Sequence, residues 1–182
     1  MKTSGLGDKG GAILILSFGS SGTEGNLYLG EKGLCLNRVN NNTFAVITQR
    51  DIPNIPETLP EGCEEAGYSL CPFSYVEDFM KDYGCWHSTL WVVNVAKLFC
   101  QNNGFPLRAV VVAAPMHLRR AIRDAEKVGF DVVSGVSPQI KGWYEKKSLL
   151  PWTRSWWRWW IREIPLRLLP WWLYKRLTLK LK

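Results

Sequence analysis

The residues best suited to chemistry in this sequence are a histidine and an arginine three positions apart, His117 and Arg120. An imidazole changes charge near neutral pH and can act as a general acid or base. A guanidinium can bind a carboxylate or a phosphate through two parallel hydrogen bonds. The pair therefore indicates a site for an anionic ligand, with His117 as a catalytic candidate. The alternative is structural, with a histidine that donates to a backbone carbonyl and a solvated arginine.

The pair follows a segment that is typical of a buried strand. Residues 109–114 form an unbroken run of small and β-branched apolar residues, the pattern of a strand buried on both faces of a parallel sheet. Pro115 ends this run, apolar residues at helical spacing predict a helix over 118–128, and a second strand is expected at 130–133. His117 is then expected in the loop at the carboxyl end of a strand, where open parallel sheets bind ligands.

Two earlier apolar runs predict strands at residues 12–18 and 43–48, and a buried helix is expected at 88–101. The crossovers between the strands are long enough for parallel pairing. The pattern therefore predicts an α/β fold, a three-layer Rossmann-like and mostly parallel sheet. In such a sheet the carboxyl ends of the first strands meet at one rim, close to His117.

Other candidate binding residues flank these elements. The loop after the first strand consists of Gly19, Ser20, Ser21 and Gly22. Such a loop can bring backbone N–H groups to an anion or a cofactor carboxylate, and an ordinary turn is an equally good interpretation. Ser88 is a candidate helix N-cap, and Asn94 places an amide on an apolar helix, where it needs a partner. Both are also candidates for ligand contacts.

The positive charge of the chain is concentrated at its C-terminal end. Residues 141–182 contain 11 Lys and Arg against two Glu, together with eight of the ten tryptophans, whereas residues 1–140 are near neutral. We therefore expect a Rossmann-like core over 1–140 and a Trp- and Arg-rich segment over 141–182. The five cysteines show no metal-ligand spacing, which fits a reduced cytoplasmic protein without structural zinc, and the polar start resembles no signal peptide.

The Trp- and Arg-rich segment is expected to open with a helix over residues 152–164 that Pro165 stops or kinks. Glu163 projects among tryptophans on the helical wheel, away from the stripe formed by Arg154, Arg158 and Arg162. A carboxylate on an aromatic face is costly without a partner. We therefore expect Glu163 to pair with His117, with Arg120 or with a ligand, and we treat it as the second catalytic candidate.

Residues 152–182 also suggest a partner. Tryptophan favours the membrane interface, and Lys and Arg favour anionic headgroups, so we expect peripheral attachment to the cytoplasmic face of the plasma membrane. We expect the first helix and some of its tryptophans to pack on the core and the remainder to contact the membrane; packing of the tryptophans on the core alone is the alternative. Nucleic acid is the less favoured partner, because the basic residues cluster at the terminus and no RNA-binding motif is evident.

The stretch VVVAAPMHLRRAIRDAEKVGFDVV resembles the signature region of the YdcF-like family, which includes SanA and ElyC. That family places His-Met-x-Arg-Ala after a strand, and His117, Arg120 and Ala121 match it. The ends of its Ser-x-x-Thr-x-x-Asn motif match Ser88 and Asn94. The Arg-Glu-x-x-x-Arg of its SanA-like branch matches Arg162, Glu163 and Arg167.

The resemblance implies a Rossmann-like fold, a role in bacterial cell-envelope biogenesis and, from the YdcF branch, binding of S-adenosylmethionine. We therefore expect a small anionic or nucleotide-type ligand, with S-adenosylmethionine as the candidate cofactor, held by residues 19–22, Ser88, Asn94 and Arg120. The competing hypothesis is a non-enzymatic membrane-surface interaction protein with a vestigial pocket. Replacement of the family's Thr and Glu by Trp91 and Val93 favours that alternative.

Overall fold

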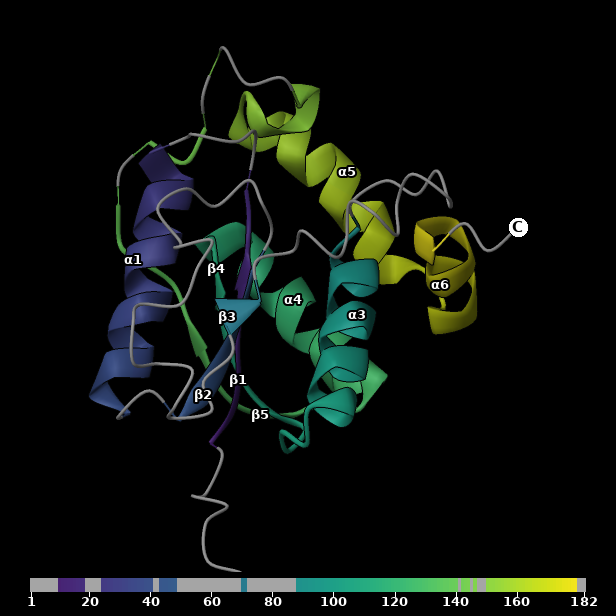
Figure 1. Cartoon of the computed structure of the whole chain (residues 1–182). Coiled ribbons are helices and arrows are strands. Elements are labelled where there is room, and N and C mark those ends of the chain that lie inside the picture. Colours follow the sequence, from purple (N-terminus) through teal and green to yellow (C-terminus); the bar gives the residue numbers. More distant parts are fainter. Residues whose placement is uncertain are drawn as a thin grey trace, which may run out of the picture.

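The computed structural model of the chain describes residues 10–18, 24–40, 43–48, 70–71, 88–140, 142–144, 146 and 150–179. These residues form a parallel sheet flanked by helices (Figure 1). The prediction of an α/β fold is therefore confirmed. The candidate binding loop of residues 19–22 lies outside the described residues.

The sheet has five strands in the order β3–β2–β1–β4–β5, and every neighbouring pair is parallel. Their bounds are β1 Gly11–Leu16, β2 Phe44–Thr48, β3 Leu70–Cys71, β4 Arg108–Ala113 and β5 Asp131–Val136. The chain winds outward from β1 to β3, then returns to β4 on the other side of β1. The winding direction therefore reverses between β1 and β4, and open parallel sheets bind ligands at the carboxyl ends of the strands that flank such a reversal.

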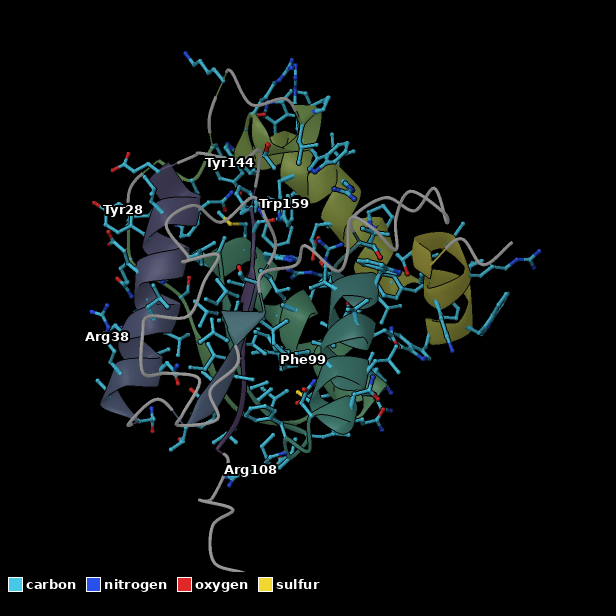
Figure 2. All side chains as sticks on the ribbon, in the orientation of Figure 1. Tyr28, Arg38, Phe99, Arg108, Tyr144 and Trp159 are labelled. Atoms are coloured by element: carbon cyan, nitrogen blue, oxygen red, sulfur yellow. The ribbon has the colours of Figure 1, made fainter. Side chains whose placement is uncertain are left out.

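The carboxyl edge of the sheet is easily located in the structure. Arg108, the first residue of β4, lies at one end of the sheet, and Trp159 and Tyr144 lie at the other (Figure 2). Trp159 packs in one cluster with Phe18 and Ala114, which follow β1 and β4 respectively. The C-terminal part of the chain therefore covers the edge at which the winding direction reverses.

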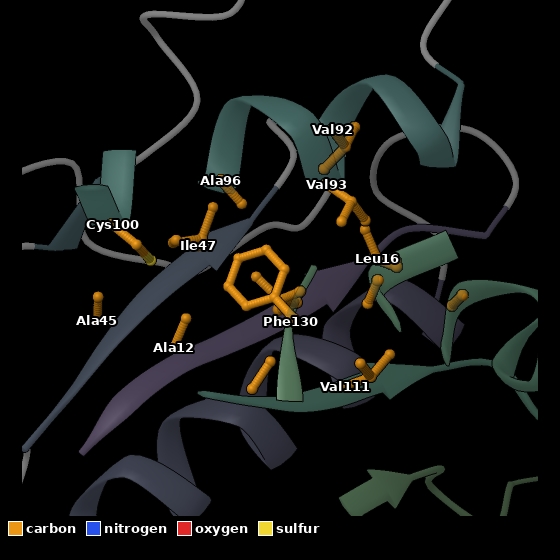
Figure 3. Close-up of a cluster of buried hydrophobic side chains, with 14 of the residues drawn as sticks. Ala12, Leu16, Ala45, Ile47, Val92, Val93, Ala96, Cys100, Val111 and Phe130 are labelled. Atoms are coloured by element: carbon orange, nitrogen blue, oxygen red, sulfur yellow. The ribbon is translucent and has the colours of Figure 1, made fainter. Parts of the chain in front are cut away.

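Helices cover both faces of the sheet (Figure 1). Helix α1 (Glu24–Val39) packs on one face, where Leu29 meets Ile13 and Ile15 of β1. Helices α3 (Thr89–Asn102) and α4 (Pro115–Val128) pack on the opposite face, over the larger cluster of buried apolar side chains (Figure 3). Because β1 alternates its apolar side chains between two covered faces, it is buried along its whole length, as a central parallel strand requires.

Helix α4 begins earlier than the sequence predicts. It starts at Pro115, directly after Ala114, so His117 lies in its first turn and the prediction of a loop is wrong. Proline is favoured at this position because the first helical N–H groups have no intrahelical acceptor and the ring presets the helical φ angle. The helix ends at Gly129, which has a φ of 112° and donates its N–H to Ala125, as expected for a C-terminal glycine cap.

The C-terminal segment forms a 3₁₀ turn, η1 (Pro151–Thr153), and two helices, α5 (Trp156–Leu168) and α6 (Trp171–Leu179). The sequence predicts that Pro165 stops or kinks the first helix; it does not stop it, since α5 continues past it to Leu168. Among the described residues, no helix combines the length and apolar character needed to cross a bilayer.

Candidate functional site

The candidate site lies where the first turn of α4 meets α5. His117 is 3% exposed and contacts the ring of Trp159 edge-on, with 5.8 Å between the ring centroids. The ring of Trp159 in turn packs on that of Phe18, with 4.8 Å between the ring centroids. Phe18 lies two residues after the end of β1. His117 is therefore enclosed at the carboxyl edge of the sheet, between the ends of β1 and β4 and the inner face of α5.

The hydrogen bonds of His117 determine its tautomer. The Nη2 atom of Arg120 lies 3.1 Å from Nδ1 of the imidazole, and a guanidinium can only donate, so Nδ1 accepts. In a neutral imidazole the proton then resides on Nε2, which lies 3.1 Å from Oγ1 of Thr89. The imidazole therefore donates to Thr89, and the hydroxyl proton of Thr89 is left to meet another acceptor.

The electrostatic surroundings keep His117 neutral. Burial lowers the pKa of the imidazole well below its usual 6.5, and the positive charges of Arg120, Arg162 and Arg167 lower it further. With Nε2 already protonated, His117 has no free nitrogen with which to deprotonate Thr89. The arrangement is therefore unlike a nucleophile–base pair, in which the imidazole accepts the hydroxyl proton.

Glu163 of α5 supplies the carboxylate of the site and is 1% exposed. Its Oε2 lies 3.3 Å from Nε of Arg120, and its Oε1 accepts a hydrogen bond from Nε of Arg167 at 3.0 Å. Arg167 also donates to the backbone carbonyl of Met116 at 3.0 Å. A single carboxylate therefore joins α5 to the first two turns of α4 through two guanidinium groups.

The site contains more hydrogen-bond donors than acceptors. Its charged groups are the guanidiniums of Arg120 and Arg167 and one carboxylate, which leaves a net positive charge beside a neutral imidazole. The indole N–H groups of Trp143 and Trp159 are buried and form no hydrogen bond within the structure described above. Since a buried polar group without a partner is costly, this excess of donors favours a ligand rich in acceptors.

A second buried polar contact continues along α4 to α6. Asp124 is fully buried and accepts hydrogen bonds from the hydroxyl of Tyr174 and from Arg123, whose Nη2 lies 3.1 Å from Oδ1. Burial raises the pKa of Asp124, and burial followed by the Asp124 charge raises the pKa of Tyr174. Together with Arg120 and Glu163, these residues form a polar seam between α4 and the two C-terminal helices.

Two of the predicted binding residues form local hydrogen bonds on α3. Ser88 caps the helix by accepting from the backbone N–H of Trp91 at 3.2 Å, and Asn94 donates to the carbonyl of Leu90 at 2.7 Å. Within the described ranges, neither side chain bonds to the His117 cluster. The structure thus brings together His117, Arg120 and Glu163, and leaves Ser88 and Asn94 to stabilise α3.

Sequence reasoning missed several residues of the site, chiefly Thr89, Trp143 and Trp159. Thr89 stands beside the predicted Ser88 and occupies the first position of α3, so the hydroxyl that reaches His117 is one residue further along the chain. Arg167, which the resemblance already singles out, follows Glu163 by one helical turn, a spacing that also predicts their ion pair. No such signal distinguishes the two tryptophans from the others in the segment.

Among the residues described, no cluster of three or more His, Cys, Asp or Glu side chains is placed to hold a metal ion. No protein-family model matches the chain, and no match was found among curated proteins or solved structures. The resemblance to the YdcF-like family therefore stays a prediction. The geometry of the site carries the functional argument.

Proposed function

We propose that the chain binds a small anionic or nucleotide-type ligand, for which S-adenosylmethionine is the first candidate, at the carboxyl edge of a three-layer Rossmann-like sheet. The observation that carries the proposal is the buried excess of hydrogen-bond donors around His117. A carboxylate or phosphate offers several lone pairs and a negative charge, so it matches both the unused donors and the positive charge.

The position of the site supports the same proposal. Open parallel sheets bind ligands where the winding direction reverses, because the loops leaving the two adjacent strands diverge there. In this chain the reversal falls between β1 and β4, and His117 follows β4 by four residues. A fold alone does not license a function, but here the topology and the donor excess point to the same edge.

Within this proposal, the two catalytic candidates are positioning residues. Glu163 holds the guanidinium of Arg120 in place, and His117 accepts one of its N–H groups, so the remaining donors of Arg120 keep a fixed direction. His117 also directs the hydroxyl proton of Thr89 away from the imidazole. Arg120 and Thr89 are the groups that would contact the ligand.

The test is calorimetric titration with S-adenosylmethionine and, separately, with inorganic phosphate. Thr89→Val keeps the shape of the side chain and removes its donor, so we expect binding to weaken roughly ten-fold, the effect of one hydrogen bond to a charged group. Thr43→Val, at the opposite edge of the sheet, is the matched control and should bind as the wild type does. Absence of saturable binding by the folded wild-type protein to either ligand would contradict the proposal.

We also propose that residues 152–182 attach the protein to the cytoplasmic face of the plasma membrane, as a peripheral membrane protein. The supporting observation is the charge of the exposed surface. Glu163 is the one acid in residues 150–179, and it is buried in ion pairs. The accessible charges of α5 and α6 are therefore all positive. Co-sedimentation of the wild-type protein with phosphatidylglycerol vesicles, and not with phosphatidylcholine vesicles, is the expected result.

A further inference from the structure

Helix α5 has two faces of different character. Its inner face carries Trp159 and Glu163, which are 3% and 1% exposed and contact the candidate site. The inner face of α5 is thus buried against the rest of the protein. Any partner of α5 must therefore approach the opposite side of the helix.

The outer side of α5 carries a continuous row of exposed apolar side chains, which we call the outer stripe. Its members are Trp157, Ile161, Ile164 and Leu168, which are 48%, 66%, 50% and 78% exposed. They follow one another at intervals of four, three and four residues, so they lie above one another along one line of the helix. Single exposed apolar residues are common on proteins, but an aligned row marks an interaction surface.

Positive charge lies on the flank of α5 between the outer stripe and the inner face. Arg158 and Arg162 are exposed, and each guanidinium lies over a tryptophan ring, 5.1 Å from the centroid of Trp157 and 4.1 Å from that of Trp152. An arginine stacked on an indole keeps its charge in the headgroup region while the ring enters the apolar layer. This arrangement suits a surface that is anionic outside and apolar beneath.

We propose that the outer stripe is the surface through which this protein enters an anionic phospholipid bilayer, with α5 lying in the plane of the interface. The proposal rests on the membrane attachment proposed above and names the residues that carry it. The helix is 13 residues long, so it lies on the bilayer and does not cross it. The inner face of α5 remains packed against the rest of the protein, and Glu163 keeps its ion pairs with Arg120 and Arg167.

A second copy of the chain fits the outer stripe less well. The four-three-four spacing also suits a helix pair, but the residues that border the apolar seam of such a pair normally carry opposite charges. Here the charged neighbours exposed beside the stripe, Arg158 and Arg162, are both positive. Two copies would therefore bring like charges together, whereas an anionic membrane neutralises them.

The experiment compares the full-length wild-type protein with the double variant Ile161→Glu/Ile164→Glu. Binding is measured by co-sedimentation with vesicles of phosphatidylcholine mixed with phosphatidylglycerol. We expect the double variant to bind at least about ten-fold more weakly, because it replaces apolar contacts with negative charges. The matched control is Leu98→Glu on α3, where the side chain is 56% exposed, and it should bind as the wild type does.

The outcomes separate this inference from the attachment on which it rests. If the wild type binds and the double variant binds equally well, attachment stands and the outer stripe is the wrong surface. If the wild type does not bind, both proposals fail. A dimer in solution that the double variant dissolves, without vesicle binding, would assign the stripe to a second copy. Leu168→Glu, at the most exposed position, repeats the test if the double variant does not fold.

Discussion

Arg120 and His117 form a hydrogen bond in which the guanidinium donates to Nδ1 of the imidazole over 3.1 Å. Because a guanidinium does not give up its proton in the accessible pH range, this bond fixes the tautomer of a buried histidine. It also opposes protonation, since a second proton on His117 would have to occupy the nitrogen that faces Arg120. The two residues are one helical turn apart on α4, so the helix itself maintains the contact.

The first prediction concerns pH. The pKa of His117 is below 6.5 in the folded protein, so the unfolded chain binds the additional proton as the pH falls through 6.5. Stability from this group is therefore fully present above that pH and decreases below it, by at most about 1.4 kcal/mol per pH unit. We expect urea unfolding to give a higher free energy of unfolding for the wild type than for His117→Gln at about pH 7. This advantage should shrink as the pH is lowered to about pH 5.

The comparison with His117→Gln isolates the histidine from other titrations. The pKa of Asp124 is raised by burial, so this carboxyl adds stability as the pH falls and works in the opposite direction. Both proteins retain Asp124, and its contribution cancels in the difference. A difference that stays constant with pH would contradict the depressed pKa.

The second prediction concerns the buried carboxylate. Glu163→Gln keeps the shape of the side chain but removes the charge that faces Arg120 and Arg167, leaving two guanidiniums without a counter-ion. Breaking a buried ion pair on one side costs about 3–5 kcal/mol, which we expect in the free energy of unfolding. Glu126→Gln on the exposed side of α4 is the control and should change stability by less than about 0.5 kcal/mol. Equal losses in the two variants would show that the ion pairs contribute nothing.

The elements around His117 were predictable because their patterns are strong. The apolar run of β4 and the helical spacing of α4 each have one physical interpretation, a strand covered on both faces and an amphipathic helix. Glu163 was predictable for the same reason, because a carboxylate among aromatic residues requires a partner. The sequence left the partner of Glu163 open among His117, Arg120 and a ligand. That choice depends on how α5 packs against α4, which no local pattern reveals.

Helix α1 was not predicted, because three of its residues are the helix-disfavouring Gly25, Gly30 and Gly33. The structure gives a reason for Gly33. A Cβ atom there would overlap the side chain of Ile15, so any larger residue at this position requires Ile15 to move. Close packing between two elements overrides helix propensity, and a sequence read one segment at a time does not reveal it.

The third prediction tests this close packing. Gly33→Ala improves helix propensity but forces Ile15 to move, and we expect a net loss of about 1–3 kcal/mol from overpacking. Ile15→Val removes Cδ1, the atom that a new Cβ would meet first. The double variant should therefore lose less stability than the sum of the two single variants in denaturant unfolding. Stabilisation by Gly33→Ala alone would show that α1 can move away from the sheet.

The fourth prediction concerns the attachment of α6. Tyr174 is 1% exposed and donates its hydroxyl proton to Asp124, while Arg123 stacks on its ring at 4.5 Å. Tyr174→Phe keeps the ring and deprives a fully buried carboxylate of a donor, so we expect a loss of about 1–3 kcal/mol. Tyr28→Phe on α1, where the side chain is 40% exposed, is the control and should leave stability unchanged.

Hydrogen exchange distinguishes a local effect from a global one. Relative to the wild type, Tyr174→Phe should speed the exchange of the α6 amides more than that of the α3 amides. The reason is that the lost bond joins α6 to α4 and leaves the sheet intact. Asp124→Asn in the same background should restore part of the loss, since an amide can be satisfied by Arg123 and the protein with less cost than an unpaired carboxylate. If α6 exchanges as slowly in Tyr174→Phe as in the wild type, the ring of Tyr174 and its contact with Arg123 hold the helix, and the hydroxyl does not.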